Sequence, residues 1–136
     1  MKKILTLLLA LATGYVVKAQ TKPTPVKTTK AAPARDTSLC GKKWLLIAVE
    51  EWAVESKPKK KQADDFLWMT GDGKYSLKRN GDAKTGTWTK QGVYINFVDE
   101  ASKEKFAYKV ENAEPTKLKV DYHVSDIHTF FTFEAR

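Results

Sequence analysis

From Leu39 to the C-terminus the chain alternates apolar and polar residues with a period of two, and this pattern constrains its fold more than any other feature. Successive side chains of a β-strand point to opposite faces, so the alternation predicts strands with one buried and one solvated face. The clearest inward sets are Tyr75 and Leu77; Phe106, Tyr108 and Val110; and Leu118, Val120 and Tyr122. No segment has the spacing of a convincing amphipathic helix, so we expect an all-β fold.

Turn signals divide this region into eight predicted strands. The glycines in Gly71-Asp72-Gly73 and Asn80-Gly81-Asp82 accept the positive φ that tight hairpin turns require. The predicted strands are residues 44–54, 66–69, 74–78, 85–89, 93–98, 105–111, 117–124 and 128–134. Short connections make sequence neighbours pair antiparallel, and closure removes both exposed sheet edges. We therefore predict an eight-stranded antiparallel up-and-down barrel.

Residues 1–19 have the layout of a signal peptide. Lys2 and Lys3 form a basic start, residues 4–12 form an apolar core, and Val17-Lys18-Ala19 predicts cleavage after Ala19. The apolar run is too short to span a bilayer as a mature helix, and no lipid-attachment motif lies at the cleavage site. We expect an exported protein, periplasmic or secreted, without a stable membrane anchor.

Residues 20–37 are rich in Pro, Thr, Lys and Ala and show no apolar periodicity. Pro23, Pro25 and Pro33 favour an extended, solvated chain. We predict a disordered linker here. One compact domain over residues 38–136 follows, since a chain of 136 residues has room for little else.

The net charge of the chain is +8, but the predicted domain carries little of it. Residues 38–136 hold 17 basic and 15 acidic residues, a net charge of +2, so no global field steers the domain onto nucleic acid. Lys57, Lys59, Lys60 and Lys61 form the one dense basic cluster. This cluster fits a solvated loop or, as the alternative, a contact with an anionic surface.

The residues that catalysis, metal binding or disulfide formation would need are scarce. The single cysteine, Cys40, fits a small buried apolar residue or an intermolecular disulfide. Asp64 and Asp65 are neighbours, and on a strand they would face opposite sides and could not share a proton. His123 and His128 flank a predicted turn and could meet, but two imidazoles without a third ligand make a weak metal site. We expect neither an enzyme nor a bound cofactor or metal.

Aromatic side chains are the candidate ligand-binding residues. Tyr75, Tyr108 and Tyr122 share the predicted inner face, where their hydroxyls could bind one another, the backbone or the polar head of a ligand. The four tryptophans suit the core and the barrel ends, or a ligand-binding wall; they are Trp44, Trp52, Trp68 and Trp88. The residues predicted to line a ligand site are Trp68, Tyr75, Trp88, Tyr108 and Tyr122.

Three segments of the predicted domain follow a known pattern. The first is Leu39-Cys40-Gly41-Lys42-Lys43-Trp44, which is similar to the opening Gly-x-Trp strand of lipocalins, although its spacing is Gly-x-x-Trp. The others are Asp65-Phe66-Leu67-Trp68 with Gly71-Asp72-Gly73-Lys74-Tyr75, and Gly86-Thr87-Trp88. Together they resemble the lipocalin-like domains of small exported bacterial proteins, over residues 39–136. The resemblance implies the barrel fold far better than it implies a function.

Two functions fit these expectations. The first is non-catalytic binding of a small, partly apolar ligand in the barrel mouth. The alternative is a structural or interaction module of the bacterial envelope that docks another protein through its surface. An open mouth lined by tryptophan and tyrosine favours the first function. A filled interior, with Phe130 left outside while Phe131 and Phe133 face in, favours the second.

Overall fold

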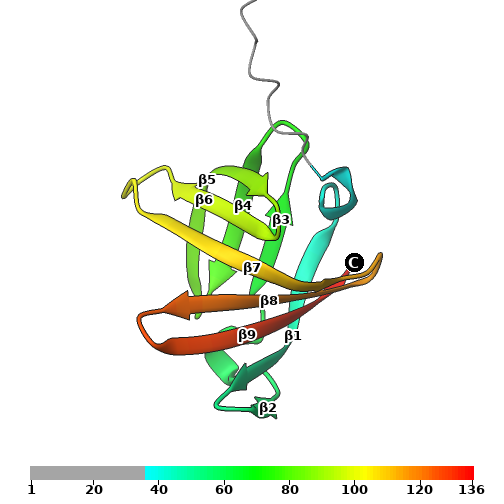
Figure 1. Cartoon of the computed structure of the whole chain (residues 1–136), viewed down its shortest axis with the longest axis vertical. Coiled ribbons are helices and arrows are strands. Elements are labelled where there is room, and N and C mark those ends of the chain that lie inside the picture. The colour runs from blue at the N-terminus through cyan, green and yellow to red at the C-terminus, as the bar shows by residue number, and fades with distance from the viewer. Residues whose placement is uncertain (1–35) are drawn as a thin grey trace, which may run out of the picture.

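The computed structural model describes residues 36–136, which form an antiparallel β-structure (Figure 1). The expected signal peptide, 1–19, and residues 20–35 of the expected linker lie outside the described residues. The elements are two short 3-10 helices and nine strands: η1 (Thr37–Leu39), β1 (Lys43–Glu51), β2 (Val54–Ser56), η2 (Lys60–Gln62), β3 (Phe66–Met69), β4 (Lys74–Arg79), β5 (Asp82–Gln91), β6 (Tyr94–Asp99), β7 (Lys105–Ala113), β8 (Lys117–Val124) and β9 (Ile127–Ala135).

Eight of the nine strands close into a barrel, which confirms the predicted fold. From β3 to β9 each strand pairs antiparallel with its neighbour in sequence. Strand β1 closes the ring because it pairs with β3 on one side and with β9 on the other. The ladder between β1 and β9 runs from Trp44 opposite Ala135 to Glu51 opposite Thr129. The short β2 is the extra strand and pairs with the end of β1.

Inward-facing side chains form one core inside the barrel. The inner residues of the alternating strands are buried as predicted; they include Tyr75, Leu77, Phe106, Tyr108, Leu118 and Val120. Aromatic rings from different strands pack edge to face, with ring centroids 4.8 Å apart for Tyr75 and Phe97 and 5.3 Å apart for Phe97 and Tyr108. The period of two in the sequence therefore separates core from solvent correctly along most strands.

One end of the barrel, which we call the Trp44 end, is covered by η1. Leu39 is buried there, and the indole Nε1 of Trp44 donates a hydrogen bond of 3.0 Å to the Leu39 carbonyl oxygen. Asp36 caps the turn, since its carboxylate accepts a hydrogen bond from the Ser38 backbone N–H and lies 3.1 Å from Lys90 Nζ. Asp36 and Thr37, which we assigned to the linker, thus belong to this capping turn.

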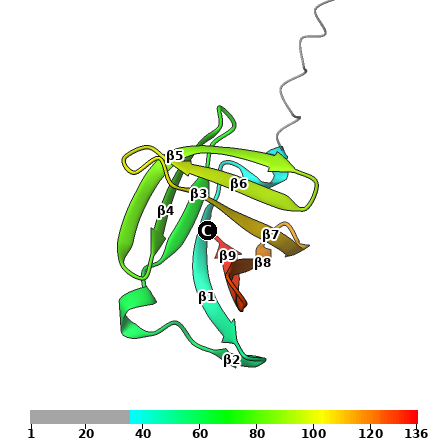
Figure 2. The same ribbon diagram turned by 60° about the vertical axis from the view of Figure 1, so that its left-hand side comes forward.

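The opposite end, which we call the Arg79 end, gathers the β1–β2, β4–β5 and β8–β9 turns. Strand β2 lies at this end, away from η1, in both views (Figure 1 and Figure 2). Asp65 anchors the β4–β5 turn, because its buried carboxylate accepts hydrogen bonds from the backbone N–H groups of Asn80, at 2.7 Å, and Gly81, at 3.1 Å. Gln62 of η2 donates to the Asn80 side chain at 2.8 Å and so ties the preceding loop to the same turn.

The expected first strand, residues 44–54, is interrupted by a turn. Strand β1 ends at Glu51, and the two-residue turn Trp52-Ala53 leads into β2, with Glu51 opposite Val54. Both turn residues have positive φ, 55° for Trp52 and 60° for Ala53. Two-residue hairpin turns need this conformation and usually place Asn or Gly there. Neither residue occurs in the turn, so the sequence pattern did not reveal it.

Replacing Ala53 with glycine is expected to stabilise the protein by about 0.5–1 kcal/mol, because glycine adopts positive φ without the steric cost that alanine bears. Chemical denaturation of both proteins measures this difference. The matched control is Ala107→Gly inside β7, which should lose about 0.5–1 kcal/mol. Equal losses in the two variants would show that the turn is not strained.

Candidate functional site

The Arg79 end carries a cation on the inner face of the barrel. Arg79 follows Tyr75 and Leu77 on the same face of β4, since alternate residues of a strand share a face. Its guanidinium carbon lies 4.2 Å from the ring centroid of Tyr122 and 5.0 Å from that of Phe106. Aromatic rings therefore surround a charge that would otherwise face only the apolar core.

Several polar atoms around this cation lack hydrogen-bond partners among the described residues. They are Nη1 of Arg79 and the hydroxyl oxygens of Tyr75 and Tyr108, all three inaccessible to solvent. The nearby Asp65 carboxylate is engaged by the β4–β5 turn, and within residues 36–136 no carboxylate forms an ion pair with Arg79. Buried polar groups are rarely left unpaired, so this cluster requires an explanation.

The protonation states make the cluster rich in donors. Burial raises the pKa of Tyr108 to about 12, although the adjacent Arg79 guanidinium opposes the change. Burial also raises the pKa of Tyr75 to about 12, and the charge of Asp99 adds to this effect. For Arg79, burial lowers the pKa, but the phenol oxygens of Tyr108 and Tyr122 outweigh burial and the net shift is upward. At neutral pH the site therefore holds one cation and neutral phenols.

The barrel interior is filled, so of the two alternatives, an open mouth lined by aromatic residues and a filled interior, the structure has the second. A void beside Arg79 and Tyr108 has a volume of about 10 Å³, close to the space that one water molecule needs. Tyr75, Trp88 and Tyr108 are buried within the core instead of lining an open cavity. The Trp88 indole Nε1 donates to the Thr70 carbonyl oxygen at 3.0 Å, so its donor is engaged as well.

The five predicted ligand-binding residues do not form one group. Tyr122 is half-buried at the Arg79 end, and the buried Tyr108 lies beside it with ring centroids 5.7 Å apart. Trp68 lies on the outer face of β3, is 48% exposed, and lines an outer groove with Lys43, Phe66 and Arg136. Trp52, at the β1–β2 turn, is also outside the core, with 80% of its surface exposed.

Arg79 and Phe106 are the site residues that we did not predict as such. Phe106 was assigned to the inner face but not to a site, and Arg79 fell one residue beyond the predicted strand 74–78. Continuing the alternation of Tyr75 and Leu77 by one step would have placed Arg79 on the inner face. An arginine at an inward-facing position of a strand is the sequence feature that could have indicated this site.

An exposed apolar lip extends the inner face beyond the core at the Arg79 end. Val54, Val124 and Ile127 form this lip and are 66%, 50% and 51% exposed. Val124 pairs with Ile127, and it follows the inward Tyr122 by two residues. Val54 pairs with Glu51 of β1. Glu51 follows the buried Val49 by two residues, so it lies on the inner face, and on its other side it pairs with Thr129 of β9. By strand alternation all three lip residues therefore lie on the face that is continuous with the barrel interior.

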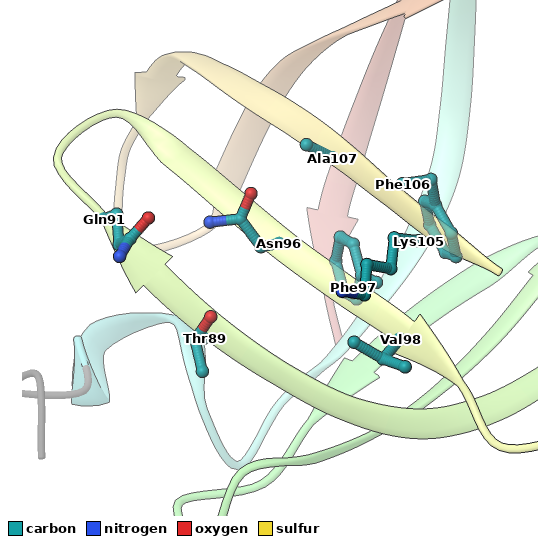
Figure 3. A pocket seen from close by; sticks show the side chains of 8 residues that line it. All are labelled: Thr89, Gln91, Asn96, Phe97, Val98, Lys105, Phe106 and Ala107. Atoms are coloured by element: carbon teal, nitrogen blue, oxygen red, sulfur yellow. The ribbon is translucent and has the colours of Figure 1, made fainter. Parts of the chain in front are cut away.

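The hollows on the outside of the barrel lack comparable chemistry. A hollow of about 490 Å³ lies over β5, β6 and β7. Figure 3 shows the side chains that line it, among them Thr89, Asn96 and Phe97. Lys59, Lys60 and Lys61 border another hollow together with Glu51 and Asp82, so acids lie beside these lysines of the basic cluster. Within residues 36–136, no residue that lines either hollow has a buried side-chain polar atom without a hydrogen-bond partner.

The two histidines meet on the outer face, as the sequence suggested they could. The rings of His123 and His128 stack with centroids 4.1 Å apart, and His128 Nδ1 lies 2.8 Å from a carboxylate oxygen of the buried Asp121. In the described part of the chain no group of three or more His, Cys, Asp or Glu side chains could hold a metal ion. The same part contains no helix of the length and apolarity that crossing a membrane requires.

Comparisons with known proteins support the fold. No protein-family model matches the chain, and no curated protein matches it. A lipocalin-like protein from Bacteroides uniformis has a similar solved structure, with a TM-score of 0.56 and 17% identity over 71% of this chain and 97% of that chain. An uncharacterized protein from Bacteroides eggerthii gives a TM-score of 0.53 and 14% identity over 72% of this chain and 99% of that chain. At these identities the similarity shows the fold alone: this chain has the fold of the lipocalin-like proteins of Bacteroides.

Proposed function

We propose that the chain is an exported, non-catalytic binding protein for a small, partly apolar ligand, which it holds at the Arg79 end of the barrel. The observation that carries this proposal is the lip of Val54, Val124 and Ile127. Val124 and Ile127 are cross-strand partners, and exposed apolar residues that adjoin one another and continue a core face mark a binding surface. The void inside the barrel is too small for such a ligand, so its apolar part would lie against the lip.

Docking of another protein through the outer surface of the barrel is the second candidate function. It is supported by the filled interior and by Phe130, which lies on the outer face of β9 while Phe131 and Phe133 are buried. The Phe130 ring does not form a bare patch, because Lys119 lies over it at 5.2 Å from the centroid and pairs with Glu50. The lip of three aliphatic side chains suits a small molecule better than the broad, aromatic-rich core of a protein interface.

Binding of the neutral fluorescent probe N-phenylnaphthylamine tests the proposal. We expect saturable binding to the full chain, and about a 10-fold loss of affinity in the double variant Val124→Ser, Ile127→Ser, which removes apolar contact area. Val93→Ser is the matched control, since Val93 is equally exposed but lies at the β5–β6 turn. Unchanged binding in the lip variant, or no binding to the full chain, would contradict the proposal.

Native mass spectrometry of the protein purified from its own cells separates the two candidate functions. A retained mass of a few hundred daltons is expected for a small ligand. A retained polypeptide would instead favour the docking module.

A further inference from the structure

We propose that the ligand carries a carboxylate and that Arg79, with Tyr108, binds this group. The inference rests on the proposed function for the location of the ligand, and it adds the chemical class of the ligand's polar head. Three observations support it: the absence of an ion pair to Arg79 among residues 36–136, the unpaired donors around it, and the small space beside it.

Arg79 forms no ion pair among residues 36–136, although the Asp65 carboxylate borders the same small void. A cation turned toward an apolar interior is normally paired with an acid. Among residues 36–136 none of the ion pairs includes Arg79, and Asp65 already accepts two backbone hydrogen bonds. By contrast Lys84, at the same end, pairs with Glu104. The rings of Phe106 and Tyr122 partly compensate the charge, but they leave the N–H donor of Nη1 unpaired.

The unpaired groups around Arg79 can all donate a hydrogen bond; the other unpaired buried atom of residues 36–136, Asp121 Oδ1, is an acceptor. Nη1 of Arg79 is a donor, and the Tyr108 hydroxyl is fully buried and remains protonated at neutral pH, because burial raises its pKa to about 12. The Tyr75 hydroxyl is a further unpaired donor on the same inner face of β4. A set of donors around one cation is complementary to an acceptor-only anion and not to a cationic head group.

The size of the space favours a carboxylate over larger anions. The void measures about 10 Å³, room for one oxygen atom, and is bordered by Arg79, Tyr108 and also Asp65, whose carboxylate already accepts two backbone hydrogen bonds. A planar carboxylate at the edge of this void can accept hydrogen bonds from the guanidinium, whose fork of donors matches it. The apolar part of the ligand then runs outward to Val124 and Ile127. Val124 follows Tyr122 by two residues on the inner face of β8, and Ile127 is its partner on β9.

Competition between two ligands of equal chain length tests this inference. Decanoate and decanol are each used to displace N-phenylnaphthylamine from the full chain. We expect decanoate to bind about 10- to 100-fold more tightly, which is the range for hydrogen bonds to a charged partner. Arg79→Gln should abolish this preference while decanol binding stays unchanged. Lys84→Gln is the control, because Lys84 is a cation at the same end that already has a partner.

Two further variants distinguish a specific site from a general effect of charge. Arg79→Lys keeps the cation but loses the fork of donors, so it should retain part of the preference for decanoate. Tyr108→Phe should weaken decanoate binding about 2- to 10-fold and raise the melting temperature, since it removes an unpaired buried hydroxyl. Thermal melts of each variant show that the fold is retained.

The outcomes separate this inference from the proposed function. Equal affinity for decanoate and decanol in the unmodified chain, or an equal loss of both in Arg79→Gln, would overturn the carboxylate site and leave ligand binding at the lip intact. Failure of N-phenylnaphthylamine to bind would contradict the lip. Decanoate would then be titrated directly by calorimetry, and binding that depends on Arg79 would still support the carboxylate site.

Discussion

Replacing Trp88 with alanine is expected to lower the free energy of unfolding by about 3–5 kcal/mol, the range for truncating a fully buried aromatic residue. Trp88 lies inside β5 opposite Phe97, and the loss includes both the cavity and the hydrogen bond to Thr70. Urea denaturation of the full chain measures the change. A loss of this size in a domain of about 100 residues would leave it close to unfolding at room temperature.

Trp68→Ala is the matched control for this prediction. The substitution is the same, but Trp68 lies outside the barrel and is 48% exposed, so its loss should stay below about 1 kcal/mol. Similar losses for Trp68 and Trp88 would contradict the assignment of Trp88 to the core.

The alternation of residues predicted most of the strands because each of them buries one face. In β4 and β8 polar residues stand between Tyr75 and Leu77 and between Leu118 and Val120, so a one-residue error would place charge in the core. Strand β3 lacks this information, since Phe66-Leu67-Trp68-Met69 is apolar throughout. The outward position of Trp68 follows from its pairing with Ser76 and Lys43, which the sequence pattern does not contain.

The site was less predictable than the fold, for two physical reasons. Whether a barrel interior is open or filled depends on the stagger of its strands and on side-chain conformations, and neither is encoded in a period of two. The Arg79 cluster also joins residues from β4, β7 and β8 that come together only when the barrel closes. Arg79, Tyr108 and Tyr122 are therefore neighbours in space but not in any sequence motif.

The same closure brings two strands close together at Gly86. Gly86 pairs with Tyr75 on one side and with Asp99 on the other, where β5 bends between β4 and β6. A side chain at this position would enter the backbone of β6. The neighbouring hydrogen bond from Glu100 N–H to the Thr85 carbonyl oxygen, at 2.8 Å, holds the two strands at this distance.

Gly86→Ala is accordingly expected to cost about 3 kcal/mol or more, because overpacking against backbone cannot be relieved by a side-chain rotation. The added Cβ would lie 1.9 Å from the Val98 carbonyl oxygen and 3.0 Å from the Glu100 backbone nitrogen. Gly71→Ala is the matched control: a Cβ there meets no atom within 4 Å, so the variant should be neutral or up to about 1 kcal/mol more stable. Urea denaturation measures both variants. If they unfold at the same urea concentration, the backbones of β5 and β6 do not approach at Gly86 as closely as the structure places them.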